Sequence, residues 1–194
     1  MDCNKIGKLI LSLRKEKNMT QKEIADAMNI SDKTISKWER GLGCPDVSLL
    51  NDLSHILGVN IEKILLGDLS PNDADGGNMK RIKFYVCPSC GNLVNNTGQA
   101  EISCCGRKLE PLIAKPEDDT HNIRIDEIEE DYYITIPHEM SKSHYISFVA
   151  YVKYDRVLIV KLYPEQDAAV RFPKMYGGKL YFYCSQHGLW VKEK

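Results

Sequence analysis

The stretch CSQHGLW near the end of the chain places Cys184 three residues before His187. Such a pair can be half of a metal site, a nucleophile with its base, or two unrelated neighbours. Three further histidines, His121, His138 and His144, also lie after residue 116. Imidazole and thiolate are ligands that transition metals prefer. The concentration of these side chains therefore indicates a mixed histidine and cysteine metal site.

Two other interpretations of these residues stay open. A cysteine nucleophile with a histidine base usually has a third group that orients the base, and no such motif accompanies Cys184 and His187. The dyad would also leave the other three histidines without a role. The simplest alternative is that the histidines are surface side chains that bind nothing.

A second group of metal-ligating residues lies upstream, in the stretches CPSCG and SCCG. Two residues separate Cys87 from Cys90, the spacing of a knuckle that directs two sulfurs at one tetrahedral ion. The adjacent pair Cys104 and Cys105 is unusual, because zinc ribbons normally repeat the two-residue gap. Four thiolates suit Fe or Zn equally well. A segment this short cannot build an adequate core, so we expect the ion to stabilise the fold by on the order of 10 kcal/mol; a redox role is the alternative.

The elements that would carry these residues form a multidomain α plus β protein. Residues 1–67 show apolar positions at helical spacing, and Thr20 with Glu23 forms a capping-box pattern. Ser31 is a further N-cap and Gly41 a terminator. We expect five helices, over residues 6–18, 20–30, 31–41, 46–59 and 60–68.

The remainder of the chain changes character twice. Residues 68–80 are rich in Gly, Asp, Asn and Pro and are predicted to be a linker. Residues 81–115 form the metal domain with the four clustered cysteines. Residues 116–194 show period-two alternation, clearest from Ile146 to Val152 with a turn at Asp155, which indicates an antiparallel β domain with hairpins.

The composition limits the classes of protein to consider. The 194 residues are 43% hydrophobic and 27% charged, which favours globular domains. No apolar run could span a membrane and the N-terminus is no signal peptide, so we expect a cytoplasmic protein without a membrane partner. Structural disulfides are rare there, and we interpret Cys3 and Cys44 as ordinary thiols.

The run MTQKEIADAMNISDKTISKWERG resembles the helix-turn-helix of Cro/repressor-type transcription regulators. Small Ala25 suits a close crossing of two helices, and Ile35 and Trp38 would face the core. The resemblance implies that the second helix of the motif lies in the major groove of double-stranded DNA. The alternative is an amphipathic helix bundle that binds protein.

The resemblance also implies roles for individual side chains. On the outer face of that helix, Lys33 would donate to guanine and Asp32 would accept from cytosine. The other candidates for contacts to bases or phosphates are Thr20, Gln21, Ser36, Lys37 and Arg40.

The charge balance bears on how DNA would be bound. The formal net charge of the chain is −1, so attraction to DNA must be local. Residues 1–41 contain nine Lys and Arg against six Asp and Glu. We therefore expect salt-sensitive binding by a homodimer to a palindromic operator.

The pattern YVCPSCGN…ISCCGRKLEPL resembles desulforedoxin and the matching domain of desulfoferrodoxin, where four cysteines bind one iron. PHEMSKSHYISFVAYV and YCSQHGLW resemble the iron domain of desulfoferrodoxin and neelaredoxin, the superoxide reductases. This resemblance implies an immunoglobulin-like β-sandwich and an iron ion with Cys184 as axial ligand. The implied equatorial ligands are His121, His138, His144 and His187.

The chain departs from that family beside the first ligand. Asp119 and Thr120 stand where the family has Glu and Lys, which leaves Asp119 as the one candidate catalytic residue. Glu139 replaces a proline between His138 and Met140. The combined features favour a DNA-binding regulator that senses superoxide or redox state through iron. The alternatives are a superoxide reductase carrying a DNA-binding domain, and a structural protein whose sites hold zinc.

Overall fold

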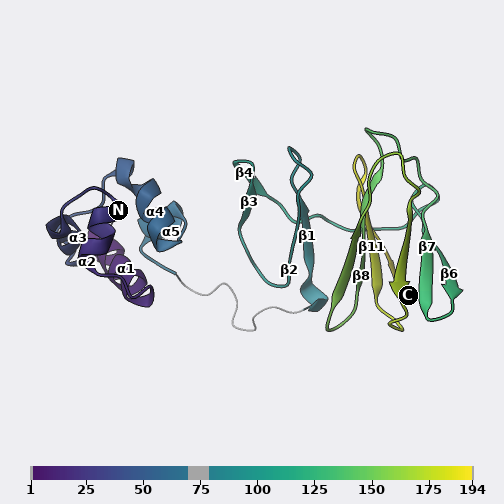
Figure 1. Cartoon of the computed structure of the whole chain (residues 1–194), viewed down its shortest axis with the longest axis horizontal. Helices are drawn as coiled ribbons and strands as arrows, with labels where there is room; N and C mark the ends of the chain where they lie inside the picture. The colour runs from purple at the N-terminus through teal and green to yellow at the C-terminus, as the bar shows by residue number, and fades with distance from the viewer. Residues whose placement is uncertain (1, 70–78, 194) are drawn as a thin grey trace. The chain divides into compact units, whose positions relative to one another are not determined.

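The computed structural model describes residues 2–69 and 79–193. The chain divides into two units, Met1–Pro71 and Asn72–Lys194, and each is described by itself. Figure 1 shows helices throughout the first unit and strands in the second. Most of the predicted linker, residues 70–78, lies outside the described residues.

The described part of the first unit contains the five predicted helices and one 3-10 turn, η1, before α4. None of the helices within residues 2–69 and 79–193 has the length and apolar character needed to cross a membrane. The elements are α1 (Cys3–Glu16), α2 (Gln21–Ala27), α3 (Asp32–Glu39), η1 (Val47–Leu49), α4 (Leu50–Leu57) and α5 (Ile61–Leu66).

The predicted start and stop signals of α2 and α3 are present. Thr20 Oγ1 accepts from the backbone N–H of Glu23, whose carboxylate accepts in return from Thr20 N. Gly41 follows the C-cap of α3 with a φ of 71°, and Gly41 N donates to Trp38 O at 2.8 Å. Leu42 N donates to Lys37 O at 2.9 Å, which completes a Schellman motif.

Close packing fixes α3 against α1 and α2. Ala25 and Ile35 are fully buried and Trp38 is almost so, as the sequence predicted. A Cβ placed on Gly7 of α1 would lie 2.0 Å from the carbonyl oxygen of Trp38. Since no larger residue fits there, α1 and the end of α3 are in direct backbone contact.

The prediction that Cys3 and Cys44 are ordinary thiols was wrong. Their sulfurs form a disulfide, with the Cα atoms 4.9 Å apart. Cys3 is the first residue of α1, and Cys44 lies in the loop after α3. The fold brings together residues separated by 41 positions, a distance over which sequence spacing gives no signal.

The described part of the second unit begins with the 3-10 turn η2 (Met79–Arg81), and the regular elements that follow it there are strands. These strands are β1 (Lys83–Val86), β2 (Leu93–Asn96), β3 (Ile102–Cys104), β4 (Arg107–Leu109), β5 (Lys115–Pro116), β6 (Arg124–Ile128), β7 (Asp131–Thr135), β8 (Ile146–Val152), β9 (Val157–Lys161), β10 (Ala169–Pro173), β11 (Lys179–Cys184) and β12 (Gly188–Glu193).

Two of the sheets form a sandwich, in agreement with the predicted architecture (Figure 1). One has the order β5-β12-β11-β8-β9 and the other the order β10-β7-β6. β1 with β2 and β3 with β4 form separate hairpins in the cysteine-rich segment. Among the described strands, all pairings are antiparallel except that of β5 with β12.

Strand β8 belongs to two hydrophobic cores at once. Val149 and Tyr151 pack in the core between the two sheets. Phe148 and Ala150, on the opposite face, pack against Phe84 of β1 in a second core. The period-two pattern is therefore present, but both faces of the strand are buried, because the β1–β2 hairpin packs on the outer one.

Candidate metal centres and DNA-binding surface

The candidate DNA-contacting residues of α3 form a largely exposed surface. Lys33 and Lys37 are exposed, and Ser36 is half-buried. Asp32, also exposed, lies in the first turn after the N-cap Ser31. Beyond the last turn, exposed Arg40 donates through Nε to the carbonyl of Ser36 at 3.1 Å. These side chains of one short helix and its cap can reach an external ligand together.

Thr20 and Gln21 have structural contacts in addition to their predicted role. The Thr20 hydroxyl belongs to the capping box of α2. Gln21 Nε2 donates to Glu39 Oε2 at 2.7 Å, which ties α2 to α3. Glu39 also pairs with Arg14 of α1 at 2.5 Å, and this bond raises the pKa of the guanidinium. Arg14 and Glu39 are positioning residues. Glu39 is one of the positions of the helix-turn-helix motif, whereas Arg14 was not identified from the sequence.

Four cysteine sulfurs converge in the cysteine-rich segment. Their Sγ atoms lie within 4.8 Å of one another. Cys104 Sγ is 3.6 Å from Cys90 Sγ and 3.9 Å from Cys105 Sγ. Metal–sulfur bonds of about 2.3 Å in a tetrahedron place sulfurs about 3.8 Å apart. The spacing therefore fits one tetrahedral ion shared by these residues and Cys87.

Turn geometry explains how adjacent cysteines can share this site. Cys105 and Gly106 form the two-residue loop of the β3–β4 hairpin, and their φ angles are 50° and 73°. Two left-handed residues in such a loop are typical of a type I′ turn. The turn directs Cys105 Sγ back toward Cys104, so adjacent ligands need no irregular strand. Gly91, with a φ of 66°, closes the other knuckle by donating to Cys87 O at 2.8 Å.

The thiols of this cluster do not ionise alike. The backbone N–H of Ser89 donates to Cys87 and lowers its pKa to about 6. Hydrogen bonds with Cys90 and Cys87 raise the pKa of Cys105 to about 12. The Cys87 thiolate is stabilised, whereas its contact with Cys105 opposes ionisation of Cys105. A bound cation would favour the thiolate form of both.

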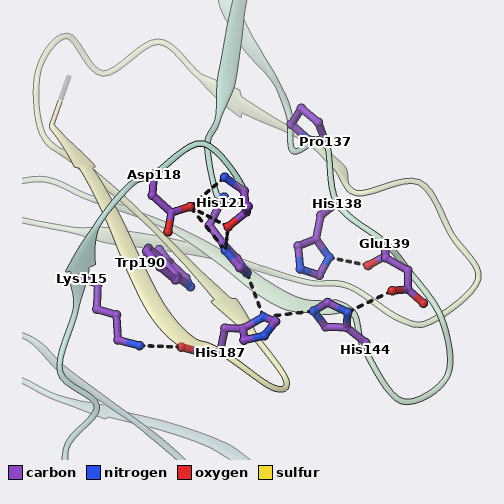
Figure 2. A pocket seen from close by; sticks show the side chains of 10 residues that line it. Lys115, Asp118, His121, Pro137, His138, Glu139, His144, His187 and Trp190 are labelled. Atoms are coloured by element: carbon purple, nitrogen blue, oxygen red, sulfur yellow. Dashed lines mark hydrogen bonds and ion pairs between the residues drawn. The ribbon is translucent and has the colours of Figure 1, made fainter.

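Four histidines surround one pocket at the edge of the β-sandwich. Figure 2 shows the imidazole rings of the four facing a common space. The pocket has a volume of about 500 Å³. One donor atom from each histidine and the sulfur of Cys184 lie within 4.8 Å of one another. The histidines are His121, His138, His144 and His187.

A turn and a neighbouring loop hold two of these residues in place. Cys184 ends β11 at a bulge, and His187 lies in the turn to β12. Ser185 N donates to Tyr145 O at 2.9 Å, and Tyr145 N donates to Ser185 Oγ at 3.1 Å. These bonds fix the segment of His144 beside the turn of His187.

Hydrogen bonding alone cannot account for all the close contacts among these donor atoms. His187 Nδ1 lies 3.1 Å from His121 Nε2, 3.2 Å from His144 Nε2 and 3.4 Å from Cys184 Sγ. One ring nitrogen cannot bond three such partners, because it carries either one proton or one lone pair. His138 Nε2 is buried and has no hydrogen-bond partner among the described residues. A metal ion would satisfy all five donors, so the residues fit a metal.

The opposite ring nitrogens have partners of their own. Thr120 Oγ1 lies 2.9 Å from His121 Nδ1. Glu139 serves two rings: its carboxylate lies 3.1 Å from His144 Nδ1, and its carbonyl contacts His138 Nδ1. Such outer contacts fix the orientation of metal-binding imidazoles. Three histidines therefore present Nε2 to the centre, and His187 presents Nδ1.

The environment favours the neutral form of two of these imidazoles, His121 and His138. Burial, and then the proximity of His138, lowers the pKa of His121. Burial also lowers the pKa of His138, with His144 acting in the same direction and the carbonyl of Glu139 opposing it. Neutral imidazole is the form that ligates a metal.

Three residues of the pocket were missed by the sequence reasoning. Trp190 stacks on His121, with ring centroids 4.4 Å apart. Lys115 Nζ donates to His187 O at 3.2 Å and lies 5.3 Å from the Trp190 ring centre (Figure 2). Asp118 accepts from the backbone N–H of His121 at 2.7 Å. Lys115 reaches the pocket because β5 pairs in parallel with β12. No local sequence signal indicates such a pairing.

Asp119, the candidate catalytic residue, is not among the pocket-lining residues. Its neighbours Asp118 and Thr120 line the pocket instead. The Asp119 side chain is exposed, and its carbonyl accepts from Asn122 Nδ2 at 3.0 Å. Within the part of the chain that the structure describes, Lys115 is the one lysine or arginine of the pocket lining, so it and not the segment before His121 brings a positive charge there.

The fold and the two clusters define a helix-turn-helix domain joined to a β-sandwich with groups that could hold metal ions. The helix-turn-helix family HTH_3 matches residues 10–64. A transcriptional activator of Enterococcus faecalis, BcrR, is 34% identical over 77 residues, which cover 38% of this chain and 38% of that protein.

The remainder of the chain is similar to a different group of proteins. A desulfoferrodoxin homologue of Methanothermobacter thermautotrophicus is 27% identical over 118 residues, which cover 56% of this chain and 95% of that protein. The crystal structure of the superoxide reductase from Treponema pallidum matches 57% of this chain and 97% of its own, with a TM-score of 0.51 and 16% identity. This structural match supports the fold of the β-sandwich region. The chain therefore joins an N-terminal HTH_3-type domain to a C-terminal desulfoferrodoxin-like and superoxide reductase-like region.

Proposed function

We propose that this protein is a sequence-specific transcription regulator that senses superoxide or redox state through a non-haem iron site. One observation carries the proposal. A helix-turn-helix domain shares the chain with a pocket where four imidazoles and one thiol converge within 4.8 Å. The first element implies an output on double-stranded DNA, and the second implies an input by a redox-active metal.

The DNA-binding role is assigned to the exposed surface of α3. Lys33 and Asp32 would read base edges, since they lie in the first turn of the helix. Lys37 and Arg40, near its end, would contact phosphates, as would the start of α2 at Thr20 and Gln21. Helix-turn-helix domains of this kind read half-sites, so the proposal includes a homodimer on a palindromic operator.

The metal role is assigned to the five-residue cluster of the sandwich. Neutral imidazoles and one thiolate form a donor set that suits iron. An iron ion bound there would supply one electron to a small oxidant such as superoxide. The residues that would hold it are His121, His138, His144, Cys184 and His187. The four-cysteine cluster of Cys87, Cys90, Cys104 and Cys105 would hold Fe or Zn, with a stabilising role.

The charges of the pocket fit an anion only in part. Lys115 supplies a positive charge, and it is held in place by the carbonyl of His187 and the face of Trp190. Asp118 and Glu139 bring negative charge to the same lining, although each is engaged by a histidine-bearing segment. This mixture of charges favours a site that senses superoxide over a site that turns it over rapidly.

The second candidate function is superoxide reductase activity. The observation in its favour is Lys115 at the pocket, because a cation draws an anionic substrate toward the site. Thr120 counts against it, since its hydroxyl carries no charge. DNA binding would then serve to locate or regulate the enzyme.

Metal analysis and visible absorption of anaerobically purified protein test the proposal. We expect iron and a thiolate-to-iron band that appears on oxidation. The band should vanish in Cys184→Ser and persist in Cys90→Ser, which alters only the four-cysteine cluster. If protein from cells grown with ample iron contains only zinc, both the sensor and the enzyme function are contradicted.

DNA affinity and superoxide consumption separate the two functions. A duplex selected from a random pool should bind with different affinity to the iron-oxidised and iron-reduced forms if the chain is a sensor. Equal affinity combined with catalytic consumption of superoxide would favour the enzyme.

A further inference from the structure

We propose that Cys3 and Cys44 form a reversible redox pair, and that its disulfide holds the DNA-binding domain in its higher-affinity form. The pair responds to a peroxide-class oxidant and to small thiols, and it acts without the metal sites. The proposal rests on the DNA-binding half of the proposed function and not on the iron half.

The location of the pair connects it with the recognition helix. Cys3 begins α1, and Cys44 lies between the end of α3 and the turn η1. The Cα atoms are 4.9 Å apart, within the range that a disulfide needs, so the bond forms without movement of the backbone. Both residues are half-buried, so part of each remains accessible to small molecules.

The neighbours of the disulfide belong to the end of α3. A Cβ on Gly41 would lie 2.0 Å from Asn4 Oδ1, so the first turn of α1 contacts the residue that terminates α3. Pro45, directly after Cys44, is buried, and Asp46 caps η1 by accepting from Ser48 N at 2.9 Å. The disulfide thus anchors a short loop at its middle, between the end of one helix and the start of the next.

Two anchors of different kind therefore fix the recognition helix. The first is the close packing of Gly7 on Trp38, which persists in any redox state. The second is the covalent bond to Cys44. When it is reduced, the loop that follows Arg40 loses its covalent tie to α1, and that loop gains freedom. Ordering the loop when the domain binds DNA then costs conformational entropy, which the oxidised form has already lost.

The chemistry balances with a peroxide as the oxidant. The thiolate of one cysteine attacks a peroxide oxygen and the O–O bond breaks. Hydroxide leaves and takes up the proton that the thiol released, which gives water, and the cysteine becomes a sulfenic acid. The second thiol attacks this sulfur, the S–O bond breaks, and a second water leaves as the S–S bond forms. Two electrons pass from the two cysteines to the peroxide. A small dithiol reverses the step by exchange and ends as a disulfide itself.

The test compares DNA affinity of the full-length protein after treatment with hydrogen peroxide and with a dithiol. The probe is a duplex selected by the oxidised protein from a random-sequence pool. Peptide mapping without reductant counts the Cys3–Cys44 cross-link in each sample. Cys3→Ser is the matched control, since it removes the pair and keeps every metal-binding cysteine; its helical content is checked by circular dichroism.

We expect the cross-link to form with hydrogen peroxide and to disappear with the dithiol. Reduction should weaken DNA binding by about fivefold or more, at the low end of allosteric couplings. Cys3→Ser should bind like the reduced protein under both treatments. Equal or higher affinity of the reduced protein would overturn the proposal, as would a response that Cys3→Ser retains. A pool that yields no duplex would instead overturn the DNA-binding function, and this proposal with it.

Discussion

Trp190 stacks on His121, with ring planes inclined by 6° and centroids 4.4 Å apart. His121 is buried, so the indole forms one wall of its site. The same indole faces the ammonium group of Lys115 on β5. A single aromatic residue thus links a predicted metal ligand to the cation of the pocket, and it provides a spectroscopic probe of both.

Metal binding should change the fluorescence of Trp190. The chain has two tryptophans, and the other, Trp38, belongs to the helical unit. We expect Fe²⁺ added to metal-free protein to quench part of the emission. The reason is that the metal would bind His121, whose ring stacks on the indole. Trp190→Phe should keep a ring on His121 and lose the response. A quench of equal size in Trp190→Phe would show that the metal binds elsewhere.

Lys115 should determine the affinity of the pocket for small anions. For the iron-loaded protein, Lys115→Gln is expected to weaken azide binding by about tenfold, within the range of electrostatic focusing. The dissociation constant is measured from visible absorption at low and high ionic strength, and the difference should shrink as salt screens the charge.

Lys142→Gln is the matched control for this prediction. Its side chain is 81% exposed and pairs with Glu165 outside the pocket lining. The azide affinity of this variant should equal that of the unaltered protein. Equal effects of the two substitutions would mean that only the total charge matters.

The local features of this chain could be read from its sequence. The capping box of Thr20 and Glu23 and the knuckle of Cys87 and Cys90 each involve residues a few positions apart, where backbone geometry alone sets the outcome. The period-two alternation of β8 is also present in the structure. The sequence did not show that both faces of this strand are buried, because the outer face is covered by the hairpin that carries Phe84.

The features that the sequence did not predict depend on long-range pairing. Lys115 reaches the pocket because β5 adds to β12 in parallel, next to Trp190. Cys3 meets Cys44 because α1 and the end of α3 pack closely. Gln21 contacts α3 through the carboxylate of a residue 18 positions away. In each case the partner is set by the tertiary fold and not by neighbouring residues.

Gly106 should be required for metal affinity at the four-cysteine cluster. Its φ is 73°, and no atom lies within 4 Å of a Cβ added to it, so a substitution changes conformational preference without a clash. Gly106→Val should cost about 1–2 kcal/mol for the left-handed conformation and weaken zinc binding by about tenfold. Gly106→Asn should behave nearly like the unaltered protein, since Asn tolerates this conformation. Competition with a chromophoric chelator measures both; equal affinities of the two variants would contradict the role of the turn.

Lys33 and Lys37 should affect DNA binding in different ways. Lys33 lies in the first turn of α3, where side chains reach base edges, so Lys33→Ala is expected to cost about 1–3 kcal/mol on the selected duplex and to relax specificity at one position. Lys37 lies in the last turn, and Lys37→Ala should weaken binding to all duplexes alike and lower the slope of log affinity against log salt by about one. Titrations at several salt concentrations, on the selected duplex and on single-base variants, measure both effects. If both substitutions act alike on every duplex, α3 contacts the backbone only, and base reading must come from another element.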